Sequence, residues 1–170
     1  EIKRFKYDGH VNFDGTVKGS LANGQMPRID LNFGCSEAWL HNSETNKKID
    51  SLAFKGYYTN GDGKNLKTSE LRLLGMHAKP GTGVFDGNFI MRDFVNPKIL
   101  MQLNSNLELE FIGAFLGIKD LQRITGQISL KMNFKELMDM SAPEQSMGKL
   151  TEGIQSELAV HNLTFRIPNY

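Results

Sequence analysis

Residues 98–111 read Lys98-Ile-Leu-Met-Gln-Leu-Asn-Ser-Asn-Leu-Glu-Leu-Glu-Phe111, and this stretch decides the fold class. From Ile99 every second residue is apolar except Ser105, while from Gln102 onward the alternate positions carry amides and glutamates. Successive side chains of a β-strand point to opposite faces, so this alternation predicts a strand with one apolar and one polar face. The parity does not slip at Ser105, which favours one continuous strand of about 46 Å.

The same period of two recurs along most of the chain, in the segments 11–21, 29–33, 52–58, 85–91, 128–134 and 158–167. Turn-forming residues separate these segments: Asn23-Gly24, residues 60–63, residues 80–83 and Asn96-Pro97. Short connections without alternating helices argue against a parallel α/β sheet. We predict a mainly β protein with a strongly curved, groove-forming antiparallel meander. Short helices over 112–122 and 135–142 are expected to cover an end or edge of the sheet.

Composition excludes several classes of function. The chain has 170 residues, 39% of them hydrophobic, which is typical of one folded module rather than a disordered segment. Its 20 Lys and Arg nearly balance 19 Asp and Glu, so there is no basic field for nucleic acid. A single cysteine, Cys35, excludes an internal disulfide and a thiolate zinc cluster. No apolar run approaches the roughly 18 residues of a membrane span.

Candidate catalytic and metal-binding residues are few. The histidines at 10, 41, 77 and 161 lack the close spacing that places two ligands on one strand or helix face. Cys35 has no identifiable base and is interpreted as a small hydrophobic side chain. Glu108 and Glu110 would lie about 7 Å apart on one strand face, which is compatible with a carboxylate pair but also with a solvated surface. We therefore expect no enzymatic activity, no metal and no cofactor.

The apolar face itself is the strongest feature of the sequence, and three structures are compatible with it. It packs on a second sheet as a β-sandwich or jelly roll, closes as a barrel, or stays open as a groove. An open groove would need an apolar ligand, because soluble monomers rarely leave such a surface bare. The residues expected to line a lipid groove are Phe85, Phe89, Met91, Ile99, Met101, Leu103, Leu107, Leu109, Phe111, Ile128, Leu130, Met132 and Phe134.

The order of four motifs resembles the AsmA family. Residues 13–33 resemble its glycine-punctuated hairpin, and residues 52–61 its element of strand, glycine, aromatic residues and polar turn. Residues 85–103 join a Phe-x-Gly strand to a long amphipathic strand through Asn96-Pro97, and residues 124–132 resemble the opening strand of the next repeat. The resemblance covers roughly residues 11–167, and the order of the motifs carries it.

The resemblance implies a function. AsmA-like proteins of Gram-negative bacteria, related to TamB and the bridge-like lipid transfer proteins, are anchored in the inner membrane by an N-terminal helix. Their periplasmic part forms a long apolar groove implicated in phospholipid transport and outer-membrane assembly. The chain begins with Glu1, so we interpret residues 1–170 as a single β-groove module from a longer AsmA-like protein. Expected partners are phospholipids or other acyl-chain lipids and neighbouring repeats of the same chain, and in a crystal a second copy is expected to pair through an edge strand.

Two alternatives remain. The first is a β-sandwich module that binds carbohydrate or a protein partner, for which Tyr57 and Tyr58 would supply a stacking surface beside Trp39, the only tryptophan. The second is a hydrolase that depends on Glu108 and Glu110. Lipid extraction from the purified protein separates the lipid-binding hypothesis from both.

Overall fold

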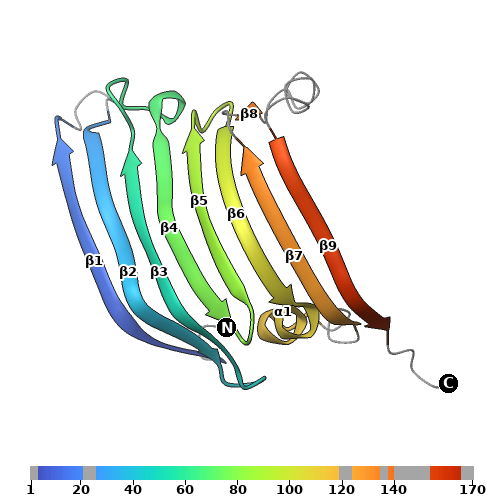
Figure 1. Ribbon diagram of the computed structural model, residues 1–170. Coiled ribbons are helices and arrows are strands. Elements are labelled where there is room, and N and C mark those ends of the chain that lie inside the picture. Colours follow the sequence, from blue (N-terminus) through green and yellow to red (C-terminus); the bar gives the residue numbers. More distant parts are fainter. Residues whose placement is uncertain (1–3, 21–25, 119–123, 135–137, 140–153, 166–170) are drawn as a thin grey trace.

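The alternating segments form one antiparallel sheet in the computed structural model, which describes residues 4–20, 26–118, 124–134, 138–139 and 154–165 (Figure 1). The described strands are β1 (Phe5–Lys18), β2 (Arg28–Asn42), β3 (Lys47–Thr59), β4 (Glu70–Pro80), β5 (Val84–Arg92), β6 (Lys98–Glu108), β7 (Ile124–Phe134), β8 (Met138–Asp139) and β9 (Ile154–Phe165). The described helices are the 3₁₀ turn η3 (Leu66–Thr68) and the α-helix α1 (Leu109–Leu116).

The topology is the predicted meander. Strands lie in the order β1-β2-β3-β4-β5-β6-β7-β9, and β8 pairs with β6 outside this path. The turn residues that the structure describes act as expected, whereas Asn23-Gly24 lies outside the described residues. Residues 81–83 connect β4 to β5, with Gly81 at φ +63°, and Asn96-Pro97 directly precedes β6. The prediction of a mainly β meander is confirmed.

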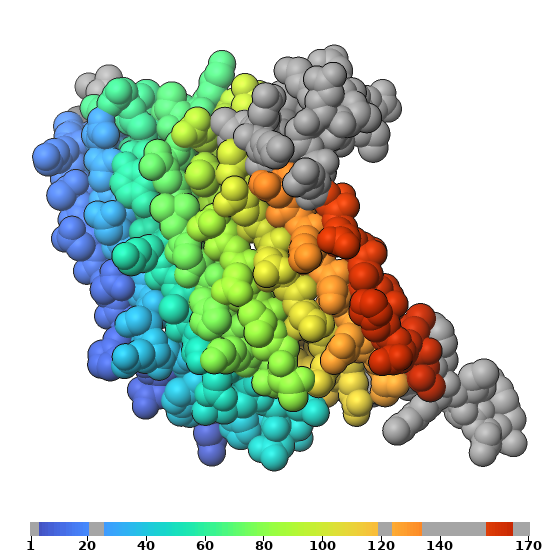
Figure 2. Space-filling model, viewed as in Figure 1, coloured from blue at the N-terminus to red at the C-terminus, as the bar shows by residue number. Residues whose placement is uncertain are grey.

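The sheet is a single open layer. Figure 2 shows its strands side by side from β1 to β9, with no second layer in front of them where described residues form this face. Within the described residues no second sheet packs on the first, so the β-sandwich and jelly-roll alternatives are wrong.

The predicted strong curvature is also wrong. Register shifts occur in the pairings among β1–β5 and between β7 and β9, whereas β5–β6 and β6–β7 pair without interruption. Bulges bend strands locally, and Figure 1 shows β1–β3 bending along their length. The uninterrupted ladders in the middle keep the sheet open.

The long strand over 98–111 is shorter than predicted. β6 ends at Glu108, and the chain turns directly into α1. Residues 109–116 satisfy a helical period as well as alternation, because Phe111, Ile112, Phe115 and Leu116 are spaced one turn apart. The helix ends at Gly117, which is left-handed at φ +75°, while the Ile118 amide bonds the Gly113 carbonyl over 2.8 Å.

The predicted helices fare differently. α1 overlaps the helix expected over 112–122 but begins three residues earlier, and residues 119–122 lie outside the described residues. Of the helix expected over 135–142, Met138 and Asp139 instead form β8, opposite Ile99 and Lys98 of β6. The other residues of that segment lie outside the described residues.

Candidate functional site

Cross-strand register gathers the apolar side chains of β5, β6 and β7 on one face of the sheet. Phe89 pairs with Met101, and Leu103 pairs with Met132. Directly opposed residues of antiparallel strands share a face. The expected groove residues on this face are Phe85, Phe89, Met91, Ile99, Met101, Leu103, Leu107, Ile128, Leu130 and Met132. Phe134 ends β7, and its side chain lies outside the described part of the structure.

The same face continues over β1–β4, where bulges preserve its apolar character. Cys35 and Ala38 differ in parity, yet both lie on this face because Glu37, at φ 53°, is bulged between them. Gly75, at φ +57°, likewise separates Leu73 from Met76. A one-residue insertion interrupts a period of two, which is why sequence reasoning did not extend the face through these strands. The apolar side chains of β2–β4 on this face that were not among the expected groove residues include Phe33, Leu40, Ile49, Leu52, Phe54, Leu71, Leu73 and Met76. Of these, Phe33, Leu52 and Phe54 lie in segments whose alternation already predicted strands.

Most of this face is only partly buried. Among the described residues, the buried hydrophobic side chains are Ala38, Ala78, Leu109, Phe111 and Phe115. Along β1, by contrast, Val11 is 80% exposed and Phe13 is 71% exposed. Large apolar surfaces of this kind mark interaction sites in soluble proteins.

Among the residues that the structure describes, the best-packed region lies where α1 crosses the end of the apolar face. Leu109 is 8% exposed and Phe111 is 4% exposed, so both belong to the core beneath the helix. Their predicted place on an extended strand is wrong, because both lie in α1. The ring of Phe111 stacks on that of Phe115 at 5.7 Å, and Phe115 contacts Phe5 of β1 at 5.5 Å.

Two hollows follow the apolar face at this end. A pocket of about 400 Å³ lies between α1 and the strands, and its lining includes Leu40, Leu52 and Phe111. A second hollow of about 470 Å³ lies over β1–β3 and includes Phe33, Leu40 and Leu52. Because both include Leu40 and Leu52, they form one apolar path.

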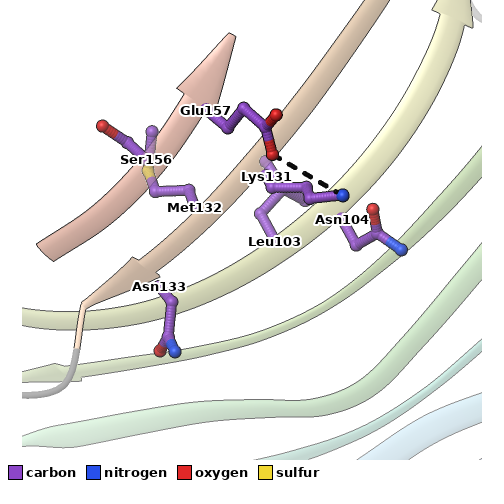
Figure 3. A pocket seen from close by; sticks show the side chains of 7 residues that line it. All are labelled: Leu103, Asn104, Lys131, Met132, Asn133, Ser156 and Glu157. Carbon is purple, nitrogen blue, oxygen red and sulfur yellow. Dashed lines mark ion pairs between the residues drawn. The ribbon is translucent and has the colours of Figure 1, made fainter.

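The opposite face carries polar side chains. Asn88 donates to Gln102 over 3.3 Å, and Gln102 donates to Asn133 over 3.5 Å, which forms a row of amides across β5, β6 and β7. A shallow hollow of about 610 Å³ over β6, β7 and β9, drawn in Figure 3, is lined by residues of the polar face such as Asn104 and Lys131 and also by Leu103 and Met132 of the apolar face. Its ion pair joins Lys131 to Glu157 over 3.6 Å, with both side chains well exposed. An exposed pair of this kind contributes at most about 1 kcal/mol.

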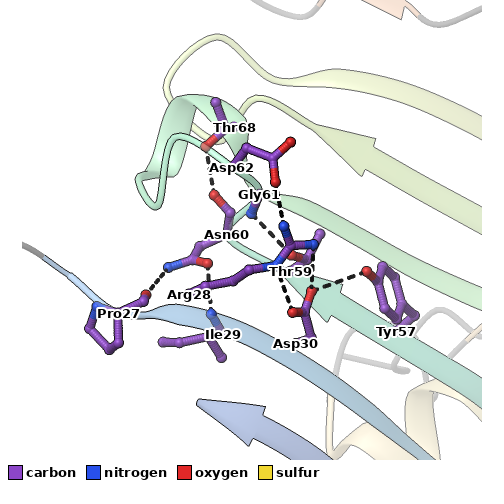
Figure 4. Close-up of polar contacts among 10 residues, drawn as sticks. All are labelled: Pro27, Arg28, Ile29, Asp30, Tyr57, Thr59, Asn60, Gly61, Asp62 and Thr68. Atoms are coloured by element: carbon purple, nitrogen blue, oxygen red, sulfur yellow. Dashed lines mark hydrogen bonds and ion pairs between the residues drawn. The ribbon is translucent and has the colours of Figure 1, made fainter. Parts of the chain in front are cut away.

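A network of polar side chains lies at the end of the sheet opposite α1 and connects the strand ends to the loop after β3. The buried side chain of Asn60 accepts from the amide of Ile29 and donates to the carbonyl of Pro27, each over 2.8 Å (Figure 4). Arg28 bonds both Asp30 and Asp62. Its hydrogen bond holds the pKa of Asp30 below its usual value. Sequence reasoning identified the 60–63 turn but not these side-chain contacts.

Glu70 forms the second part of this network. It bonds Arg72 and Arg92, the latter over 2.5 Å. Burial raises the pKa of Glu70, but the hydrogen bonds and charges of the two arginines outweigh it and hold the pKa below its usual value. The network neutralises its own charges and stabilises the strand ends.

The candidate catalytic groups do not converge. Glu108 ends β6 and accepts from Thr82, whereas Glu110 lies in the first turn of α1, so their predicted common strand face is wrong. Burial raises the pKa of the Cys35 thiol, which disfavours the thiolate. In the described parts of the chain, no group of three His, Cys, Asp or Glu side chains is arranged to hold a metal. The hydrolase alternative loses its geometric basis.

The two tyrosines proposed for carbohydrate stacking lie apart. Tyr57 lies under the guanidinium of Arg72, 5.5 Å from the ring centroid, and donates to Asp30. Tyr58 faces the other side of β3 and contacts Phe94 at 6.0 Å. Consecutive residues of a strand point to opposite faces, so the two rings do not form one platform.

Comparisons of this chain with protein-family models, curated proteins and solved structures give no match. The AsmA resemblance therefore stays a prediction, as do the single module, its partners and its periplasmic location. Within the described residues, no helix has the length and apolar character needed to cross a membrane.

Proposed function

We propose that this protein binds the acyl chains of phospholipids on the apolar face of its sheet. It acts without enzymatic chemistry, as a lipid-handling segment in transport between the inner and outer membranes or in outer-membrane assembly. The observation that carries the proposal is the continuous apolar face across eight strands, of which α1 covers only one end.

The physical basis is burial of apolar area. Transferring hydrocarbon from water to such a face is favourable by about 25 cal/mol for each Å² buried. Both the acyl chain and the face lose water contact, so binding needs no polar recognition of a headgroup. Methionines such as Met101 and Met132 suit this role, because their flexible thioethers adapt to chains of different shape.

The periplasmic location and the inner-membrane anchor of the complete protein belong to this proposal. They are supported by the AsmA-like order of motifs over residues 13–132 and by the open sheet with one apolar face.

The test combines lipid extraction with a pair of variants. Organic extraction of the purified protein followed by mass spectrometry should recover phospholipid. Leu103→Glu places a charge in the middle of the apolar face and should remove most of this lipid while the protein stays folded. Asn104→Glu places the same charge next to it on the polar face, opposite Lys131, and should retain the lipid. An empty extract from the unmodified protein, or equal lipid in both variants, would contradict the proposal.

A further inference from the structure

The pocket between α1 and the sheet differs from the rest of the apolar face because it is walled on two sides. Phe111, Ile112, Phe115 and Leu116 of α1 form one wall. The facing wall consists of side chains from β2 to β6, among them Leu40 and Phe85. Leu116 is 51% exposed, so the pocket stays accessible from solvent.

The lining selects hydrocarbon. Its side chains are aliphatic or aromatic throughout and offer no hydrogen-bonding group. A water or a polar headgroup placed here would lose its hydrogen bonds without replacement. The volume of about 400 Å³ lies in the usual range for small-molecule pockets, so the pocket can enclose a segment of chain rather than merely contact it.

The shape of the path indicates an elongated ligand with one end in this pocket. On one side the pocket continues through Leu40 and Leu52 into the hollow over β1–β3. At the strand ends the pocket is bounded by α1, which two contacts hold in place. Phe111 packs so closely on Gly81 that an added Cβ would lie 2.8 Å from its ring. Phe115 is tied to Asn42 by a hydrogen bond of 2.8 Å.

We propose that this pocket is the terminus of the lipid path and holds the methyl end of one acyl chain, with the rest of the chain lying over Leu52 and Leu40 toward β1–β3. The inference rests on the proposed function, because it names where a bound chain ends. If the methyl end lies in this pocket, α1 bounds the lipid path at one end. The bound lipid is then oriented with its polar headgroup away from the helix.

Photo-crosslinking tests the orientation directly. One saturated fatty acid probe carries a diazirine at its methyl end, and a second carries it beside the carboxylate. After illumination and peptide mapping, the methyl-end probe should label α1, at Ile112 or Leu116, whereas the carboxylate-end probe should label residues outside α1. Equal labelling of α1 by both probes, or methyl-end labelling confined to β7–β9, would overturn the inference while leaving lipid binding intact. Failure of both probes to label the protein would overturn the proposed function and this inference with it.

A variant pair tests the same pocket without a photoprobe. Ile112→Trp enlarges a half-buried side chain in the lining and should fill the pocket. Fatty-acid binding should weaken roughly tenfold, the loss expected from excluding about two methylene groups. Glu110→Trp places the same ring on the exposed side of α1 and should leave affinity unchanged. Leu116→Trp, at a more exposed position, supplies a second filled pocket if Ile112→Trp does not fold. Unchanged affinity in a folded pocket variant would overturn the inference.

Discussion

The side-chain amide of Asn42 donates a hydrogen bond of 2.8 Å to the carbonyl oxygen of Phe115, 73 residues further along the chain. Asn42 is the last residue of β2 and is only 1% exposed. Its side-chain oxygen also accepts from the amide of Glu44 over 3.0 Å. One buried amide thus fastens the C-terminal turn of α1 to the β2–β3 connection.

Asn42→Ala should destabilise the protein by about 1–3 kcal/mol, because it leaves buried backbone groups without their partner. Urea unfolding gives the free energy of unfolding of both proteins. Asn104→Ala, on the exposed polar face, is the control and should shift it by less than about 0.5 kcal/mol. Equal midpoints for the two variants would show that Asn42 does not fasten α1.

Truncating a phenylalanine to alanine at two positions should distinguish the packed part of the apolar face, under α1, from its exposed part on β1. Phe111→Ala should cost about 3–5 kcal/mol, because this ring of α1 is buried against the sheet. Phe13→Ala removes an identical side chain that is largely exposed on β1, and the expected loss is below about 0.5 kcal/mol. Thermal melts compare the two. A large loss in Phe13→Ala would mean that β1 is covered in solution.

The effect of a substitution at Gly75 on stability should depend on the backbone conformation that the new residue prefers and not on the space that its side chain needs. It is left-handed at φ +57°, and a Cβ added there would meet nothing within 4 Å. Gly75→Val should lower stability by about 1–2 kcal/mol, since a β-branched residue resists this conformation. Gly75→Asn should be much milder, because asparagine tolerates left-handed backbone. Both variants keep the amide that bonds Asn88, and equal melting temperatures for them would contradict the bulge.

Glu70 should make stability depend on pH in the acid range. Its folded pKa is below the unfolded value of about 4.3, so it binds protons more weakly when folded. Its stabilisation is therefore present above that value and is lost as the pH falls through the lower, folded pKa. Melting temperatures measured from neutral to acid pH should fall, and Glu70→Gln should be less stable at neutral pH with a shallower fall.

The control is Asn104→Gln, which changes an exposed, uncharged side chain on the polar face. Its pH profile of stability should match that of the unmodified protein. A Glu70→Gln profile that merely runs parallel to the unmodified one would show that the two arginines do not shift the titration.

Local signals predicted the fold where they were unambiguous. Alternation and turn residues sufficed for the meander, because the strands from β1 to β7 each pair with a neighbour in sequence and the described turns use glycine and proline in expected ways. The end of β6 was missed because Leu109 and Phe111 continue the alternation while residues 111–116 also satisfy a helical period. Tertiary packing of Phe111 and Phe115 against Gly81 and Phe5 decides for the helix.

The sequence predicted only part of the candidate site. The apolar residues of β5–β7 could be assigned to one face, since no bulge interrupts those ladders. The path over β1–β4 could not, because Glu37, Ser51 and Gly75 shift the register there. Of these three only Gly75 is a residue type that suggests a bulge. The pocket itself depends on α1 folding back over the sheet, which no local pattern encodes.

The meander also determines how the molecule folds and opens. From β1 to β7, neighbouring strands of the sheet are also neighbours along the chain, so these hairpins can add one at a time with little loop entropy to overcome. The bond from Asn42 to Phe115 is different, because the four strands β3–β6 lie between the two residues in the chain and must assemble before it forms. Opening should begin at the outermost strands, where one side of the ladder has no neighbour among the described residues. In hydrogen exchange, amides of β1 and β9 should exchange first and those of β4 and β5 last. The C-terminal end of β2, where Asn42 is hydrogen-bonded to Phe115, should exchange later than the rest of that strand.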